Sequence, residues 1–216
     1  DLRFLEISRR YAATVRRMWQ NCRAVMELAD LDDINPMTGW TKFGQAWNLN
    51  CASGLYRALL ESLAGIMTDG GAITVLPGGL SVKISGLWAC GGRWNFDRKG
   101  TGGFSHLEVD GVPIWGSCTV PQEFYTPGDH RVTAVYGAPY QGPLILDFLG
   151  SSIFALRKTE RGTALQNTGG GKLLLLSEAE PKILFNGNPA QAQNLQSKLW
   201  QLSLKTTGQL KIGGIT

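Results

Sequence analysis

After Gly71 the sequence consists of short apolar runs separated by glycine, proline and aspartate, and few folds are compatible with this pattern. Glycine occurs 28 times in 216 residues, well above the usual frequency of ~7%. Within the runs apolar and polar residues alternate, as in residues 80–85, and such alternation is typical of strands with one buried face. Turn signals recur about every 8–12 residues, which is the spacing of a β-sandwich or a partly open barrel.

Three hairpins are expected in this region, and their strand pairs are residues 72–76 with 80–85, 87–90 with 93–96, and 104–109 with 112–115. The third contains Asp110-Gly111, which is the strongest turn signal of the chain. Further strands are expected at residues 117–120, 130–136, 144–149, 153–157 and 172–176. Strands and helices do not alternate along the chain, so a parallel sheet is disfavoured.

The N-terminal part has a helical period instead. Apolar residues recur in steps of three and four along residues 4–29, close to a heptad, and six arginines flank this stripe. Such a stripe suits either a helix packed on its own chain or an oligomerisation helix. The candidate oligomerisation residues are Tyr11, Val15, Met18, Cys22 and Val25. No nucleic-acid recognition motif accompanies the arginines, so no nucleic-acid partner is expected.

Two further helices are expected. Asn50 can cap a helix over residues 51–67, and Pro189 can begin a final helix that runs to about residue 204, with Leu195, Leu199 and Leu202 facing inward. We therefore predict an α+β fold that is mainly antiparallel β. It comprises an N-terminal helical segment (residues 1–71), a β-sandwich (72–185), and a short C-terminal helix with a tail (186–216).

Composition narrows the functional classes. A hydrophobic content of 43% is enough for a real core, and the formal charge of +4 is a mild excess. No apolar run is long enough to span a membrane, and the first residues do not form a secretion signal. The four cysteines lie far apart, so no metal site is expected, and no other cofactor is indicated.

Residues 104–148 resemble the galactose-binding-like and PA14-type β-sandwiches. The likeness lies in a strand, an Asp-Gly turn and a tryptophan over residues 105–115, then a Pro-Gly turn opening a strand over residues 125–136. These families serve as carbohydrate modules, although the calcium-binding aspartates of the PA14 type have no match here. Aromatic faces bind the C–H faces of sugars, while polar side chains reach the hydroxyls. The candidate carbohydrate-binding residues are Trp88, Arg93, Trp94, Asp97 and Trp115, unless these aromatics fill the core.

A second resemblance, to the NlpC/P60-type cysteine peptidases, rests on Cys51 at a helix start and on His106 at the opening of a strand. A helix N-terminus stabilises a thiolate, which suits a nucleophile. However, that family has Asp-Cys-Ser-Gly where this chain has Asn50-Cys51-Ala52-Ser53. A cell-wall peptidase acting through Cys51 and His106 is therefore the alternative to a non-enzymatic function.

In general architecture the chain resembles bacteriophage tail, baseplate and fibre proteins, in which helical anchors hold β-sandwich modules. The resemblance implies a structural subunit of a virion, made in the host cytoplasm. Its partners would be other virion subunits, further copies of itself and possible host surface glycans. It would act by shape-complementary contacts rather than by bond chemistry.

Overall fold

The computed structural model describes residues 6, 9, 10, 13, 16, 58–68, 72–78, 81, 83–160 and 162–213. The chain forms two compact units, Asp1–Gly65 and Ile66–Thr216. In the first unit, the five described residues between 6 and 16 have helical backbone and exposed side chains. Ala58–Leu63 forms a π-helix (η1). No described helix is long and apolar enough to cross a membrane.

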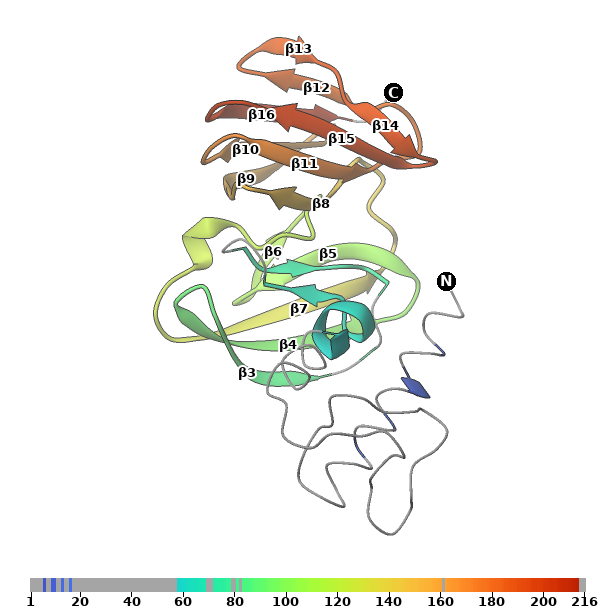
Figure 1. Cartoon of the computed structure of the whole chain (residues 1–216), viewed down its shortest axis with the longest axis vertical. Helices are drawn as coiled ribbons and strands as arrows, with labels where there is room; N and C mark the ends of the chain where they lie inside the picture. The colour runs from blue at the N-terminus through green and yellow to red at the C-terminus, as the bar shows by residue number, and fades with distance from the viewer. Residues whose placement is uncertain are drawn as a thin grey trace, which may run out of the picture. The chain divides into compact units, whose positions relative to one another are not determined.

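The second unit is built mostly from antiparallel strands (Figure 1), and strand makes up 58% of the described residues. Its first sheet pairs β1 (Ile66–Met67) with β2 (Thr74–Val75). A five-stranded sheet follows in the order β3-β4-β7-β5-β6, and we call it the mixed sheet because β4 and β7 are parallel. Its strands are β3 (Ile84–Ala89), β4 (Gly92–Gly100), β5 (Gly103–Val109), β6 (Val112–Ile114) and β7 (Asp129–Gly137). The short 3-10 helix η3 (Gln122–Phe124) precedes β7.

The remaining strands form a β-sandwich of two antiparallel sheets (Figure 1). One sheet has the order β14-β15-β11-β8 and the other the order β13-β12-β16-β10-β9. The strands are β8 (Leu144–Leu149), β9 (Ile153–Thr159), β10 (Gly162–Asn167), β11 (Gly171–Leu176), β12 (Lys182–Phe185), β13 (Asn188–Ala190), β14 (Gln193–Gln196), β15 (Leu199–Leu204) and β16 (Gly208–Gly213).

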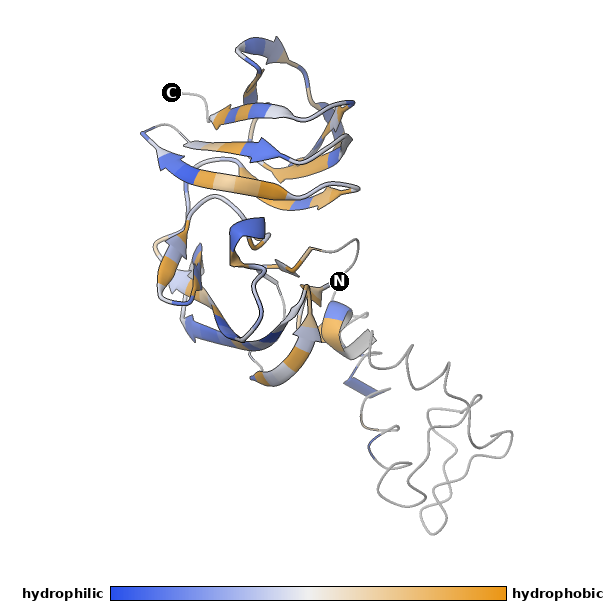
Figure 2. Cartoon of the chain, turned by 90° about the vertical axis from the view of Figure 1, so that its left-hand side faces the viewer, coloured by the Kyte–Doolittle hydropathy of each residue, from blue (hydrophilic) through white to orange (hydrophobic). Residues whose placement is uncertain are grey.

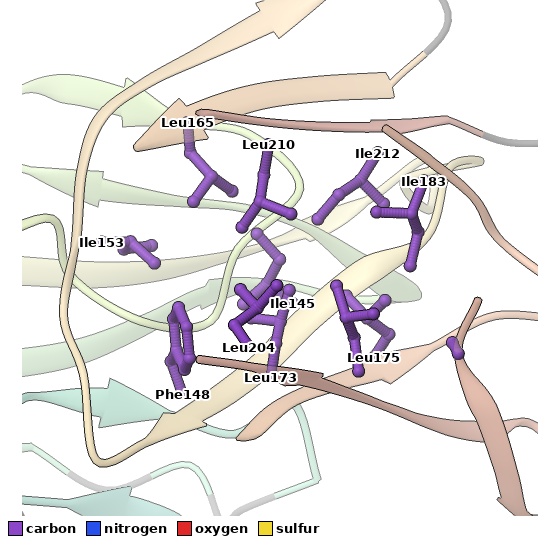
Figure 3. Packing of buried hydrophobic residues seen from close by; sticks show 12 residues of the cluster. Ile145, Phe148, Ile153, Leu165, Leu173, Leu175, Ile183, Leu204, Leu210 and Ile212 are labelled. Carbon is purple, nitrogen blue, oxygen red and sulfur yellow. The ribbon is translucent and has the colours of Figure 1, made fainter. Parts of the chain in front are cut away.

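The core of the sandwich lies between the facing sides of its two sheets (Figure 3). One side contributes Ile145, Phe148, Leu173, Leu175, Leu202 and Leu204, and the other contributes Ile153, Leu165, Ile183, Leu210 and Ile212. Most of these residues follow the two-residue period of a strand, and a bulge sets Ile145 and Phe148 three residues apart. Figure 2 shows the resulting bands of hydrophobic and hydrophilic residues. Burial of these aliphatic side chains is the main favourable contribution to the stability of the sandwich.

Residues 116–120 connect β2 to the sandwich through backbone hydrogen bonds. The Val75 N–H donates to the Cys118 carbonyl over 2.8 Å, and the Cys118 N–H donates to the Ile145 carbonyl over 2.7 Å. The Ile145 N–H in turn donates to the Gly116 carbonyl over 2.9 Å. The segment therefore covers the edge strand β8 of the sandwich, whose backbone groups would otherwise be open to another chain.

The predicted α+β class is wrong, because the described chain is a mostly antiparallel β protein with no helix of seven or more residues. Most of the predicted first helix, including Tyr11, Val15, Met18, Cys22 and Val25, lies outside the described residues. Of the predicted helix 51–67, residues 51–57 also lie outside them, and residues 66–67 form β1.

The predicted C-terminal helix is also wrong, since residues 188–204 contain the strands β13, β14 and β15. The spacing of Leu195, Leu199 and Leu202 suggested a helical stripe, but a turn at Ser197 and Lys198 divides these leucines between two strands. Leu195 is exposed, whereas Leu202 is buried and shares the core with Leu204 two residues later. Pairing with β11 therefore outweighs the local helical pattern.

Two of the three expected hairpins are confirmed. The strands β3 and β4 pair, and so do β5 and β6, which are joined by Asp110 and Gly111 with φ of 50° and 83°. Such positive φ values at both turn residues favour the Asp-Gly sequence. The first expected hairpin, residues 72–76 with 80–85, is wrong, because β2 pairs with β1 rather than with the next strand. The parallel pairing of β4 with β7 was not expected either.

Two neighbouring residues of β12 test the packing of the sandwich. Ile183 is buried in the core and Leu184 is 39% exposed. We expect Ile183→Ala to lower the free energy of unfolding by about 2–5 kcal/mol, because it removes buried methyl groups and leaves a cavity. The matched variant Leu184→Ala should change it by about 1 kcal/mol or less. Urea denaturation measures both, and equal losses would contradict the arrangement of the two sheets.

Candidate functional site

The candidate site lies on the outer side of the mixed sheet, over β3, β4 and β7. Alternation along the strands buries Leu87, Trp94 and Phe96 on the inner side. The neighbouring residues Trp88 and Arg93 are exposed on the other side. Trp88 lies directly opposite Arg93 in the pairing of β3 with β4. Two of the predicted carbohydrate-binding residues are thus brought together by the sheet.

Trp88 is the most exposed large hydrophobic side chain of the described residues, with 74% of its surface accessible. It belongs to β3, which is an edge strand of the mixed sheet (Figure 1). Large aromatic side chains are usually well buried, so an indole with this much accessible surface is available to pack against a ligand. Trp88 is therefore the best anchor for a ligand on this face.

Charged side chains extend along the same face from Arg93, which lies opposite Trp88, to Asp97, which lies four residues further along β4. Arg93 Nε lies 3.8 Å from Asp129 Oδ1, and Asp97 Oδ2 lies 3.6 Å from Lys83 Nζ and 3.7 Å from Arg131 Nη2. The three basic side chains are more than half exposed. Ion pairs of this length and exposure contribute little to stability. Their charged groups can exchange partners with a ligand at small cost.

A β-bulge shapes the site. The pairing of β3 with β4 shifts between Ile84 and Leu87, and Gly86 within the bulge has a φ of 74°. Asn95 stabilises it, because its Oδ1 accepts from the Gly86 N–H over 3.1 Å and its Nδ2 donates to the His130 carbonyl over 3.2 Å. Bulges commonly redirect side chains beside binding sites. Here the bulge precedes Trp88 by two residues.

Trp94, also predicted to bind carbohydrate, is fully buried on the inner side of the mixed sheet. Its Nε1 donates to the Ala89 carbonyl over 2.8 Å. Its ring stacks on His130 at 4.4 Å and meets the edge of Tyr125 at 5.9 Å. Trp94 is therefore part of the core that supports the outer face, and its ring is not accessible to a sugar.

His130 is buried, and both of its ring nitrogens face hydrogen-bond acceptors. Nδ1 lies 2.7 Å from Asp110 Oδ2, and Nε2 lies 2.7 Å from the Thr126 carbonyl oxygen. Burial lowers the pKa of the ring, but the hydrogen bonds to Asp110 and Thr126 and the charges of Asp110 and Asp129 raise it above its ordinary value. A doubly donating imidazolium satisfies both acceptors, so His130 ties the β5-β6 turn to the loop before β7.

Trp115 lies apart from Trp88 and already has partners. Its ring stacks on His106 at 4.2 Å, and Lys158 Nζ lies 4.1 Å from its centre. His106 Nδ1 is 3.1 Å from Ser105 Oγ. Burial lowers the pKa of His106. The negative charge of Glu108 raises this pKa, whereas the positive charge of Lys158 lowers it further. The structure thus places Trp115 in a stack with His106 rather than beside Trp88 and Arg93.

Cys51, the nucleophile of the peptidase alternative, lies outside the described residues, as do the predicted oligomerisation residues. Burial raises the pKa of the thiols of Cys90 and Cys118. Among the described residues no group of three or more histidine, cysteine, aspartate or glutamate side chains is arranged to hold a metal ion. The outer face of the mixed sheet presents an exposed indole, guanidinium groups and carboxylates.

Sequence reasoning missed Arg131 and Asp129 as members of this face. They enter it because β7 pairs in parallel with β4, which sets Asp129 beside Arg93 and Arg131 beside Asn95. This pairing joins segments about thirty residues apart, and nothing in the local pattern signals it. The alternation of β7 alone would have shown that Arg131 points away from Val132 and the core.

Comparison of the chain with protein-family models, with curated proteins and with solved structures gives no match.

The pairing of His130 with Asp110 predicts a pH-dependent stability. A raised pKa in the folded state means that the contribution of His130 is fully present below its unfolded pKa of about 6.5 and is lost as the pH rises through the folded value. Asp110→Asn should therefore destabilise the protein more at pH 5.5 than at pH 8.5. Urea denaturation across this range measures the difference.

The control for this experiment is Asp97→Asn, a carboxylate of the same sheet that faces Lys83 and Arg131 instead of a histidine. Its effect should vary little over the same pH range. A loss of stability in Asp110→Asn that is constant or grows with pH would contradict the assignment of His130 as a doubly bonded imidazolium.

Proposed function

We propose that the protein is a binding and assembly subunit whose mixed sheet recognises a carbohydrate through its outer face. The observation that carries the proposal is the 74% exposure of Trp88 directly opposite Arg93. An indole offers an apolar plane for the C–H face of a sugar ring. Arg93 opposite it, and Arg131 and Asp97 further along the same face, offer charged donors and acceptors for hydroxyl or carboxylate groups.

The support beneath Trp88 fits such a role. Asn95 holds the bulge before it, and Trp94, His130 and Tyr125 fill the inner side of the sheet. Binding groups on rigid strands lose little conformational entropy when a ligand binds. A saccharide bound to one exposed indole and a few exposed charges would have modest affinity, which is usual for sites that act in several copies.

The setting we propose is a virion: a structural subunit of a phage tail, baseplate or fibre, with a host surface glycan as ligand. It rests on the architectural resemblance of the sequence and on the β-sandwich, which is the kind of module that such proteins carry. In this setting the protein acts by contacts with neighbouring subunits and with the receptor, and it is not an enzyme. The structure gives the cysteine-peptidase alternative no added support, because His106 is stacked on Trp115.

The carbohydrate proposal is tested with Trp88→Ala. Because Trp88 is exposed, the variant should fold and unfold like the unchanged protein. We expect it to lose binding to the glycans recognised by the intact chain, with an affinity reduced about tenfold or more, or about 1.4 kcal/mol. A panel of neutral and acidic oligosaccharides followed by isothermal titration calorimetry measures this.

Leu149→Ala is the matched control, because Leu149 is a 49% exposed apolar residue of the sandwich strand β8. It should bind as the intact chain does. Failure of the intact chain to bind any member of the panel, or unchanged binding by Trp88→Ala, would overturn the assignment of this face.

A further inference from the structure

A cavity of about 610 Å³ lies on the second unit, away from the candidate carbohydrate site. Its lining combines the start of β8, the end of β11 and the loops that follow β7 and β11. The apolar part includes Leu144, Leu176, Phe104, Pro139 and Pro143. A cavity of this size holds a drug-sized ligand or a few side chains of a partner protein.

The apolar floor of the cavity extends along the sheet. Leu176 pairs with Leu144 on one side and with Leu199 on the other, so three leucines form a row across β8, β11 and β15. Leu176 is 39% exposed, although the leucines at 173 and 175 of the same strand are buried. An exposed leucine at the floor of a cavity gains stability when a partner covers it.

The rim of the cavity is acidic. Glu178 and Glu180 both line it and both are exposed, and no lysine or arginine is part of the lining. Glu178 Oε1 lies 2.6 Å from Lys198 Nζ, and within the described part of the chain Glu180 forms no ion pair. A suitable occupant therefore presents apolar side chains flanked by positive charge.

This chain itself contains a segment with that chemistry. Residues 1–29 carry six arginines and three acidic residues, together with apolar residues in steps of three and four. Of these arginines, Arg9, Arg10 and Arg16 are described and are exposed. The carboxylates of the cavity and the guanidinium groups of the segment are complementary in charge, and the apolar residues match the leucine floor.

We propose that the cavity binds the arginine-rich N-terminal segment of a second copy of this chain. Each copy has one cavity and one N-terminal segment. Because these two surfaces differ, the contact is heterologous. Contacts of this kind link copies head to tail into rings or filaments. The cavity is separate from Trp88, and a failure of carbohydrate binding would leave this inference untouched.

Two charge-reversed variants of the full chain test the contact. The first carries Glu178→Arg and Glu180→Arg in the cavity, and the second carries Arg9→Glu and Arg16→Glu in the segment. We expect the unchanged chain to self-associate in low salt, and each variant to associate at least tenfold more weakly. Sedimentation velocity measures the species present.

Mixing the two variants gives the decisive result. In an equimolar mixture the segment of the first variant complements the cavity of the second, and the reversed segment of the second complements the reversed cavity of the first, so the mixture should associate like the unchanged chain. A chain carrying all four substitutions should regain self-association, because its charges are complementary again. Such a pattern distinguishes a heterologous contact from a general effect of charge.

The control carries Glu123→Arg and Glu160→Arg, two exposed acidic residues that do not line the cavity. It should associate like the unchanged chain, and thermal unfolding should show that all variants fold. A monomeric unchanged chain, association unaffected by either pair of reversals, or a mixture that associates no better than its components would each overturn the inference.

Discussion

The pleat of the hairpin β3-β4 determines which of the chain's aromatic side chains can meet a ligand. Opposing residues of the two strands share a face, so Leu87 and Trp94 pack inward together while Trp88 and Arg93 point outward together. A shift of one residue would reverse this arrangement, burying a charged guanidinium and exposing Trp94. The stacking of Trp94 on His130 and its contact with Tyr125 oppose such a shift. The inner packing thus fixes the outer binding face.

The sequence predicted those elements that local chemistry determines. Turns were predicted at Asp110-Gly111 and at Gly91-Gly92, and both hairpins form. The residues with positive φ are Asp110 and Gly111 in one turn and Cys90 and Gly91 in the other. The extent of β8 was predicted to the residue. The helical interpretation of residues 189–204 failed because leucines spaced by three or four also occur in a hairpin whose turn, here at Ser197, lies between them. Only the partner strand β11 reveals which leucines face the core.

The candidate site could have been narrowed further from the sequence. Whether the turn is placed at Cys90-Gly91 or at Gly91-Gly92, a tight hairpin sets Trp88 and Trp94 on opposite faces, so the two could not both contact one sugar. Which of them faces the core depends on β7, whose parallel pairing with β4 places His130 beside Trp94. That pairing joins segments far apart in the sequence, and so does the ion pair between Arg93 and Asp129. The residue types indicated a binding surface, but only the tertiary structure shows which residues belong to it.

The backbone connection through residues 116–120 bears on how the two proposed surfaces would work together. The backbone of Cys118 forms hydrogen bonds with Val75 of β2 and with Ile145 of β8. The region that carries Trp88 and the sandwich that carries Leu176 are therefore parts of one unit. Each copy linked head to tail through the cavity would therefore add one Trp88 face to the assembly. A single indole with a few exposed charges binds a saccharide weakly. Repetition of such a site against a surface dense in glycans raises the overall affinity by roughly 10²–10⁴ without any new contact, provided that the spacing allows simultaneous binding. Association of the copies would then be the step that turns a weak carbohydrate site into an effective one.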